Sequence, residues 1–134
     1  MEDDQTQRVR REIAEARTET GRRRYQEVMV SEAPPPVTPY LSHGVVDSVF
    51  AELWDRPGLS RRDRRFITLA CVAAAAVDEP IQQHVYAALA SGDITREEFQ
   101  EVVLHFAYYA GWPRASALEM AYYRAIARID ADNG

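Results

Sequence analysis

One stretch near the middle of the chain is apolar almost all the way round a helix. Residues 66–77 read FITLACVAAAAV. A helix without a polar face needs neighbours on several sides, because apolar surface left in water costs free energy. Ser60 is placed to cap this helix at its N-terminus, with Asp63 as the third helical residue. The pattern therefore predicts a helix buried at the centre of a bundle.

The first forty residues differ in composition from the rest of the chain. Residues 8–29 are rich in Arg, Glu and Ala with sparse apolar positions, which predicts one or two exposed helices that Gly21 can interrupt. Residues 33–39 contain four prolines and cannot be helical, because proline lacks a backbone donor and restrains the residue before it. We expect a helical arm and connector over residues 1–40 and a helical domain over residues 41–134.

Capping residues divide this second part into further helices. Apolar residues recur at helical spacing over 44–54, and a second helix is expected from about 78 to 90. Thr95 with Glu98 forms a capping box for a helix that ends near Gly111, and a last helix follows over 114–129. No segment shows the alternation of a strand. The predicted fold class is all-α, a helical bundle of about six helices.

Composition excludes several classes of function. The net charge is −5, so a nucleic-acid surface is not expected. No apolar run approaches the roughly 20 residues of a membrane span, and the acidic start is unlike a secretory signal, so we expect a cytoplasmic protein without a membrane partner. All 16 basic residues are Arg, which excludes lysine Schiff-base chemistry. The sole cysteine, Cys71, lies among apolar residues and is interpreted as a small core residue.

Two polar residues mark the helix after Thr95. Glu101 and His105 are four residues apart, so they share one face of the helix, and the same stripe continues to Tyr108 and Trp112. A polar stripe of this kind is typical of a site cut into a helical bundle. The simpler alternative is an ordinary surface pair.

Three segments in this order resemble the carboxymuconolactone decarboxylase family. They are Trp54-Asp55-Arg56-Pro57-Gly58-Leu59, His84-Val85-Tyr86-Ala87-Ala88-Leu89, and Glu101 to His105 followed by Tyr109-Ala110-Gly111-Trp112-Pro113. The resemblance covers about residues 50–117. It implies an alkyl hydroperoxidase D-like helical fold assembled as homo-trimers or homo-hexamers. It also implies decarboxylation of a small lactone or β-keto acid in the catabolism of aromatic compounds, with no metal or organic cofactor.

The resemblance also suggests roles for individual residues. His84 matches the family histidine, and a histidine that titrates near neutrality can relay a proton. Glu101 and His105 are candidates for a general acid/base or orienting pair. Because the turn at residues 91–94 is short, we expect the helices of His84 and Glu101 to be antiparallel neighbours that share one pocket.

Further candidates would contact the substrate. Arg56 can bind a substrate carboxylate through two parallel hydrogen bonds, and Tyr109 and Trp112 can line the pocket. The substrate would be a small carboxylate or lactone.

Three alternatives remain. Peroxidase relatives carry a Cys-x-x-Cys pair and an upstream glutamate, but Val77, Pro80 and Arg65 occupy those positions here, so this chemistry is disfavoured. His84, His105 and Glu101 have the residue types of a catalytic zinc site, although nothing else favours a metal. The third alternative is a non-catalytic protein of the same fold that binds small molecules or serves in assembly.

Overall fold

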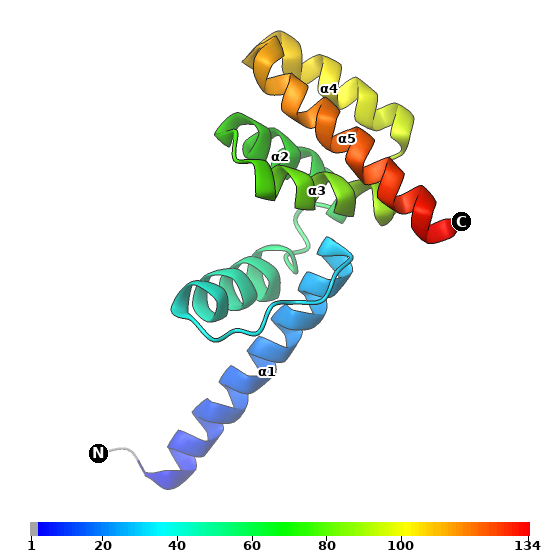
Figure 1. Cartoon of the computed structure of the whole chain (residues 1–134). Coiled ribbons are helices and arrows are strands. Elements are labelled where there is room, and N and C mark those ends of the chain that lie inside the picture. The colour runs from blue at the N-terminus through cyan, green and yellow to red at the C-terminus, as the bar shows by residue number, and fades with distance from the viewer. Residues whose placement is uncertain (1–2) are drawn as a thin grey trace. The chain divides into compact units, whose positions relative to one another are not determined.

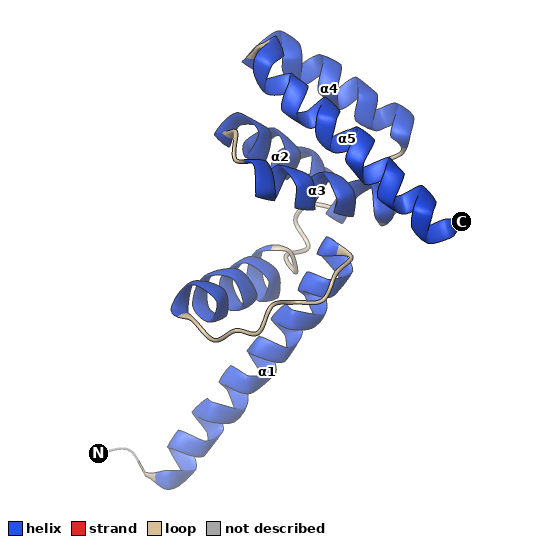
Figure 2. Cartoon of the chain, in the orientation of Figure 1, coloured by secondary structure: helices blue, strands red, loops and turns tan. Residues whose placement is uncertain are grey.

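The computed structural model describes residues 3–134, and every regular element in that part of the chain is a helix (Figure 2). The all-α prediction is confirmed. Within the described residues no helix is both long enough and apolar enough to cross a membrane. The helices in chain order are α1 (Asp4–Met29), η1 (Tyr40–Leu53), α2 (Arg61–Ala75), α3 (Asp78–Ala90), α4 (Arg96–Ala110) and α5 (Trp112–Asn133).

The chain divides into two compact units, coloured blue to cyan-green and green to red in Figure 1. The first ends at Gly58 and contains α1 and η1, and the second begins at Leu59 and contains α2 to α5. The domain boundary expected between residues 40 and 41 stays a prediction. Each unit is described below by itself.

Close backbone contact between α1 and η1 builds the first unit. A Cβ atom added at Gly21 would lie only 2.1 Å from the carbonyl oxygen of Val46, so glycine permits the approach. Helix α1 runs unbroken through this residue. The expectation that Gly21 can interrupt the helix is wrong, because its missing side chain serves packing here and not a bend.

A small aromatic core lies at the C-terminal end of α1. Val28, Met29 and Phe50 are buried together, with Tyr25 edge-on to Phe50 at 4.7 Å between ring centroids. Helix η1 is a π-helix, and the Trp54 N–H closes it by donating to the carbonyl of Val49, five residues earlier, at 3.0 Å. The N-terminal half of α1 extends beyond η1 (Figure 1). Residues 3–17 are therefore exposed on every side.

The core of the second unit forms where α5 packs against both α3 and α4 (Figure 1). Helix α2 completes the unit by packing mainly on α3. Burying large side chains of this kind is worth about 1.5–3 kcal/mol each. The largest fully buried side chains in this unit are Phe99, Leu69, Ile81, Ile94, Leu118 and Val85.

Helix α2 is not buried on all sides, contrary to the prediction. One stripe of Arg65, Leu69 and Ala73 faces the core. Ile67 is 53% exposed, and Cys71 on the same outer face is exposed as well, so interpreting this cysteine as a core residue is wrong. The reason is geometric: residues four apart lie on one side of a helix, and the buried residues of α2 all fall on that side, while α2 packs mainly on α3 and α5.

The predicted caps at Ser60 and Thr95 and the end of α4 at Gly111 are confirmed, whereas α5 begins at Trp112 and runs to Asn133, beyond both predicted ends. The hydroxyl of Ser60 accepts the Asp63 N–H at 3.0 Å. Thr95 and Glu98 form the full capping box, in which each side chain accepts from the other residue's backbone N–H. Gly111 has a φ of 102°, a conformation that L side chains rarely adopt, and it separates α4 from α5.

Candidate active site

His84 lies on α3 between the buried residues Ile81 and Val85 and is itself half-buried. Burial lowers its pKa from 6.5 to about 4, and the positive charge of Arg65 lowers it further. The imidazole is therefore neutral at neutral pH, with one nitrogen that donates and one that accepts. The expectation of a histidine that titrates near neutrality is wrong for His84, because both influences disfavour its charged form.

The residue that acts on His84 is the buried cation of this unit. The Arg65 side chain is 2% exposed, and its Nε donates to the Asp93 carboxylate at 2.7 Å. Burial lowers the pKa of Arg65, while the hydrogen bond and charge of Asp93 oppose that shift. Asp93 lies in the turn between α3 and α4. The ion pair therefore ties α2 to this turn and holds a positive charge near His84.

Sequence reasoning did not single out Arg65 or Asp93 as parts of a site. Arg65 was noted only as a departure from the glutamate of the peroxidase relatives. A usable signal was present, because Arg65 is four residues before Leu69 and eight before Ala73, on the stripe that faces the core. An arginine in that position requires a buried anionic partner.

Glu101 and His105 share a hollow on the surface of α4. The hollow measures about 320 Å³ and is also lined by Phe66 of α2. Both side chains are exposed, and the His105 ring stacks on Tyr109 at 5.1 Å between centroids. The structure thus brings Glu101 and His105 together, as their spacing predicted, but His84 does not line this hollow.

The expected antiparallel pairing of the helices that carry His84 and Glu101 is wrong. Helix α3 packs chiefly on α5 and α2, while α4 packs chiefly on α5. Helix α5 follows α4 after Gly111 and lies against α3 in the place that α4 was expected to take (Figure 1). A short turn makes two helices neighbours in sequence, but it does not oblige them to pack along their length.

The other three candidates are on the surface. Tyr109 is 84% exposed and Trp112 is 61% exposed. Trp112 borders a groove of about 270 Å³ between α4 and α5, together with Leu104 and Ala115. Arg56 belongs to the first unit, in the turn after η1, and its side chain is also exposed. Their roles in binding substrate stay predictions.

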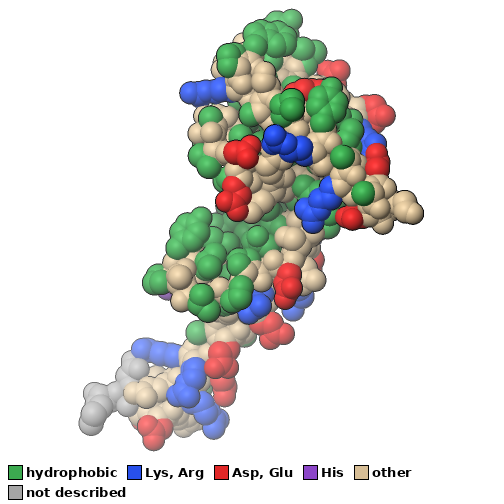
Figure 3. Space-filling model, viewed as in Figure 1, with side chains coloured by type: hydrophobic (Ala, Val, Ile, Leu, Met, Phe, Trp, Pro, Cys, Tyr) green, Lys and Arg blue, Asp and Glu red, His purple; other side chains and the backbone are tan. Residues whose placement is uncertain are grey.

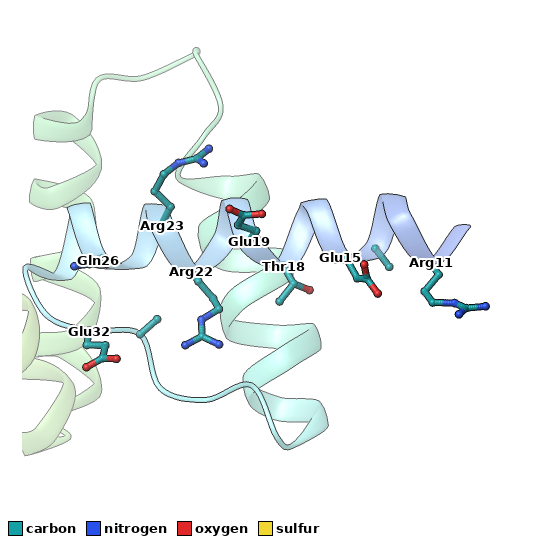
Figure 4. A pocket seen from close by; sticks show the side chains of 10 residues that line it. Arg11, Glu15, Thr18, Glu19, Arg22, Arg23, Gln26 and Glu32 are labelled. Carbon is teal, nitrogen blue, oxygen red and sulfur yellow. The ribbon is translucent and has the colours of Figure 1, made fainter. Parts of the chain in front are cut away.

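A larger hollow of about 700 Å³ lies in the first unit, along α1 and the start of the connector. Its charged side chains have both signs, and Figure 4 shows Arg22 and Arg23 leaving α1 in different directions. No side chain here is a histidine or cysteine. Across residues 3–134, no three His, Cys, Asp or Glu side chains gather as metal ligands would, so the alternative zinc set is not assembled.

The described residues form a small all-α protein with one exposed thiol and no thiol pair. Its candidate site residues include His84 on α3 and Glu101 and His105 on α4. Comparison with known protein families identifies its family. The model of the carboxymuconolactone decarboxylase family matches residues 39–122. The chain belongs to this family, and the resemblance drawn from its segments is confirmed.

Two curated relatives are decarboxylases. The 4-carboxymuconolactone decarboxylase of Acinetobacter baylyi is 35% identical over 68 residues, or 51% of this chain and 50% of that protein. The nitrosuccinic acid decarboxylase of Metarhizium robertsii is 32% identical over 79 residues, or 57% of this chain and 54% of that protein. The chain spans about half the length of these relatives.

Proposed function

We propose that this chain is a decarboxylase that removes carbon dioxide from a small carboxylate without a metal or organic cofactor. Its family and both curated relatives support this class of reaction. The structural observation that carries the proposal is His84, a half-buried neutral imidazole close to the charge of a buried arginine. Groups with strongly shifted pKa values are concentrated at functional sites.

The substrate is one that carries its own acceptor for electrons. The carbon–carbon bond to the carboxylate breaks, carbon dioxide leaves, and the electron pair moves onto a neighbouring lactone or ketone oxygen. The resulting enolate takes a proton at carbon. The names of the two relatives combine a carboxylic acid with a lactone in one case and with a nitro group in the other. Both groups can accept an electron pair, so we infer a small carboxylate with such an acceptor as the substrate class.

His84 fits the step in which negative charge develops on oxygen. A neutral imidazole donates one N–H hydrogen bond to that oxygen. It can relay a proton to carbon if its other nitrogen takes up a proton from water as the N–H proton leaves, so that the ring stays neutral and the hydroxide combines with the released carbon dioxide. The positive charge of Arg65 favours the same anionic species, because interactions between charges strengthen away from water. Arg65 acts in this scheme as a positioning residue, since Asp93 already accepts from its Nε.

Glu101 and His105 are proposed to act at their own hollow on α4. Their hollow is shallow and open on the surface of the second unit. In that position they can orient a substrate or exchange a proton with water. Tyr109 and Trp112 are proposed to cover the apolar part of the substrate. Arg56, in the first unit, is retained by itself as a candidate for binding a carboxylate.

We also propose that the protein works as a homo-oligomer, a trimer or a hexamer. Two apolar surfaces of the second unit support this assembly. One is the outer face of α2 with Ile67 and Cys71, and the other surrounds the α4–α5 junction with Tyr108, Tyr109 and Trp112. Figure 3 shows hydrophobic side chains gathered where α4 meets α5. A second copy on these surfaces would remove them from water and deepen the shallow hollow of Glu101 and His105.

A binding or assembly protein of the same fold is the second candidate. It is favoured by one observation, that Tyr109, Trp112 and the Glu101–His105 pair are exposed and do not enclose a cavity with His84. Carbon dioxide release separates the two candidates. The full chain would be incubated with a carboxylated γ-lactone, a β-keto acid and nitrosuccinic acid, and release would be followed for the wild type and for His84→Gln.

The proposal expects turnover of at least one of these substrates by the wild type and its loss in the folded variant. Saturable binding of a substrate without any release of carbon dioxide would support the binding protein instead. Release that is equal in the wild type and in His84→Gln would refute the role of His84.

A further inference from the structure

The exposed half of α1 carries an apolar seam on the side away from η1. Thr18, Gly21 and Tyr25 lie on the side that meets η1. Val9 is 44% exposed and Ile13 is 64% exposed, and both lie on the other side of the helix. The seam consists of residues at alternating spacings of three and four, the pattern of a coiled coil: Thr6, Val9, Ile13, Ala16 and Thr20.

Charges of opposite sign border this seam. Arg10 and Arg17 each follow a seam residue on one edge, and Glu12 and Glu19 each precede one on the other edge. These are the two flanking positions that set partner choice and orientation in coiled coils. Figure 3 shows acidic and basic side chains interleaved over this part of α1. The surface therefore has an apolar centre with one acidic and one basic border.

The order of charges selects both the partner and its direction. When two such helices run parallel and in register, an acidic border faces the basic border of the other helix, so Glu12 meets Arg17 of the second copy. In the antiparallel arrangement each border would face its own counterpart, with like charges opposed. We infer that α1 pairs with α1 of a second copy of this chain, parallel and in register, through the Thr6–Thr20 seam.

The existing contacts of α1 are compatible with this pairing. The seam covers about two heptads, which is short for a free coiled coil. Helix α1 is already formed, however, because its C-terminal half packs on η1. Pairing therefore does not have to pay the entropic cost of forming the helix. The 3.5 Å ion pair of Glu12 with Arg8 in the same helix is exposed on both sides, and such pairs are worth little. Glu12 can therefore exchange that partner.

Cysteine cross-linking tests the geometry. Val9→Cys and the control Arg11→Cys would each be made in a Cys71→Ser background, so that each chain holds one thiol. Both sites are exposed on the same part of α1, but Arg11 lies on the side opposite the seam. Parallel pairing in register brings two copies of residue 9 within reach of a disulfide, whereas an antiparallel pair centred on Ile13 separates them.

The pairing predicts that Val9→Cys forms a disulfide-linked dimer about tenfold faster or more than Arg11→Cys under mild oxidation, since bridging requires Cα atoms within about 7 Å. Equal rates, or no dimer from Val9→Cys, would overturn the inference. Decarboxylation is measured separately on residues of the second unit, so the two proposals can fail independently.

A charge swap tests whether α1 of a second copy is the helix that binds to the seam. In the Val9→Cys, Cys71→Ser background, one chain would carry Glu12→Arg with Glu19→Arg, and the other Arg10→Glu with Arg17→Glu. Each chain alone opposes like charges and should cross-link more slowly than the parent. The mixture should cross-link between the two chains at a rate near that of the parent. A mixture as slow as its parts would mean that another partner occupies this surface.

Discussion

The two histidines of the second unit lie in opposite environments. His84 on α3 is half-buried between core residues and feels the charge of Arg65. His105 on α4 is exposed and stacks on Tyr109, beside a shallow hollow. The same residue type is thus shielded from water in one region and open to it in the other. Since a low local dielectric strengthens each electrostatic interaction, the region of α3 has the better means to stabilise a charged transition state.

The comparison also shows that a short sequence motif does not reveal whether its side chains are buried or which residues of other helices contact them. Glu101 and His105 stand one turn apart and are prominent in the sequence, yet they lie on the surface of the described chain. The residues at helical spacing from His84 are all apolar (Pro80, Ile81, Ala87 and Ala88), and the charged residue that acts on it, Arg65, comes from another helix. Contacts between helices, and not spacing within one helix, distinguish the two sites.

The largest expected effect is on activity. His84→Gln should lower kcat by about a hundredfold or more, the usual contribution of a general acid or base. His105→Gln should lower it less, because that side chain is exposed. Carbon dioxide release by both variants measures the contrast, with circular dichroism as the check on folding. A greater loss in His105→Gln would reverse the assignment.

The next effect is on stability. Arg65→Met leaves the Asp93 carboxylate without its buried partner and should cost about 3 kcal/mol of unfolding free energy. Arg62→Met removes an exposed ion pair with Glu98 and should cost much less, because exposed pairs contribute little to stability. Urea denaturation measures both. The double variant Arg65→Met, Asp93→Asn should regain part of the loss, and equal costs for Arg65→Met and Arg62→Met would contradict the burial of this pair.

Stability should depend on pH through His84. Its pKa is about 4 in the folded chain and 6.5 as the ordinary value, so the unfolded chain binds the proton first as pH falls. The contribution is present above pH 6.5 and is lost between about 6.5 and 4, to a total of about 3 kcal/mol. Denaturation across this range measures it.

His84→Gln supplies the control for that pH dependence, because it should flatten the curve of unfolding free energy against pH between pH 6.5 and 4. Glu98 contributes to the pH dependence of stability at lower pH. The hydrogen bond from Arg62 lowers the pKa of Glu98 from 4.5 to about 2, so its contribution is lost only as pH falls below 4.5. An unchanged slope above pH 4.5 in His84→Gln would show that other groups cause the dependence.

The smallest predicted effect concerns the start of α4. Thr95→Ala removes the side chain that accepts the Glu98 N–H and should cost about 1 kcal/mol. Thr95→Ser retains the oxygen and should cost less. Thermal denaturation measures both variants, and a loss of several kcal/mol would indicate that the cap also supports the region around Asp93.

Local features of the fold were predictable because they depend on neighbours in sequence. Ser60, Thr95 and Gly111 mark helix ends through hydrogen bonds or backbone conformation within a few residues. The outer face of α2 was not predictable, since apolar character shows that a face can be buried but not what covers it. Cys71 lies on this face and was misplaced for the same reason.

For the candidate site, the sequence predicted one contact within a helix but not the arrangement of residues from different helices. Glu101 and His105 were brought together correctly because one helix carries both. The place of α5 against α3, and the burial of Arg65 with Asp93, depend on packing between distant segments. Those contacts also set the state of His84, so its lowered pKa had no counterpart in the sequence pattern.

Packing and the charge of Arg65 keep His84 neutral and chemically distinct from His105. Nuclear magnetic resonance of the imidazole carbons and nitrogens across a pH titration tests this claim most directly, with His84→Gln to assign the signals. A pKa of about 4 is expected for His84 in the folded protein. A midpoint at the ordinary value of 6.5 would contradict it, because it would show an imidazole in contact with water and without an influential cation nearby.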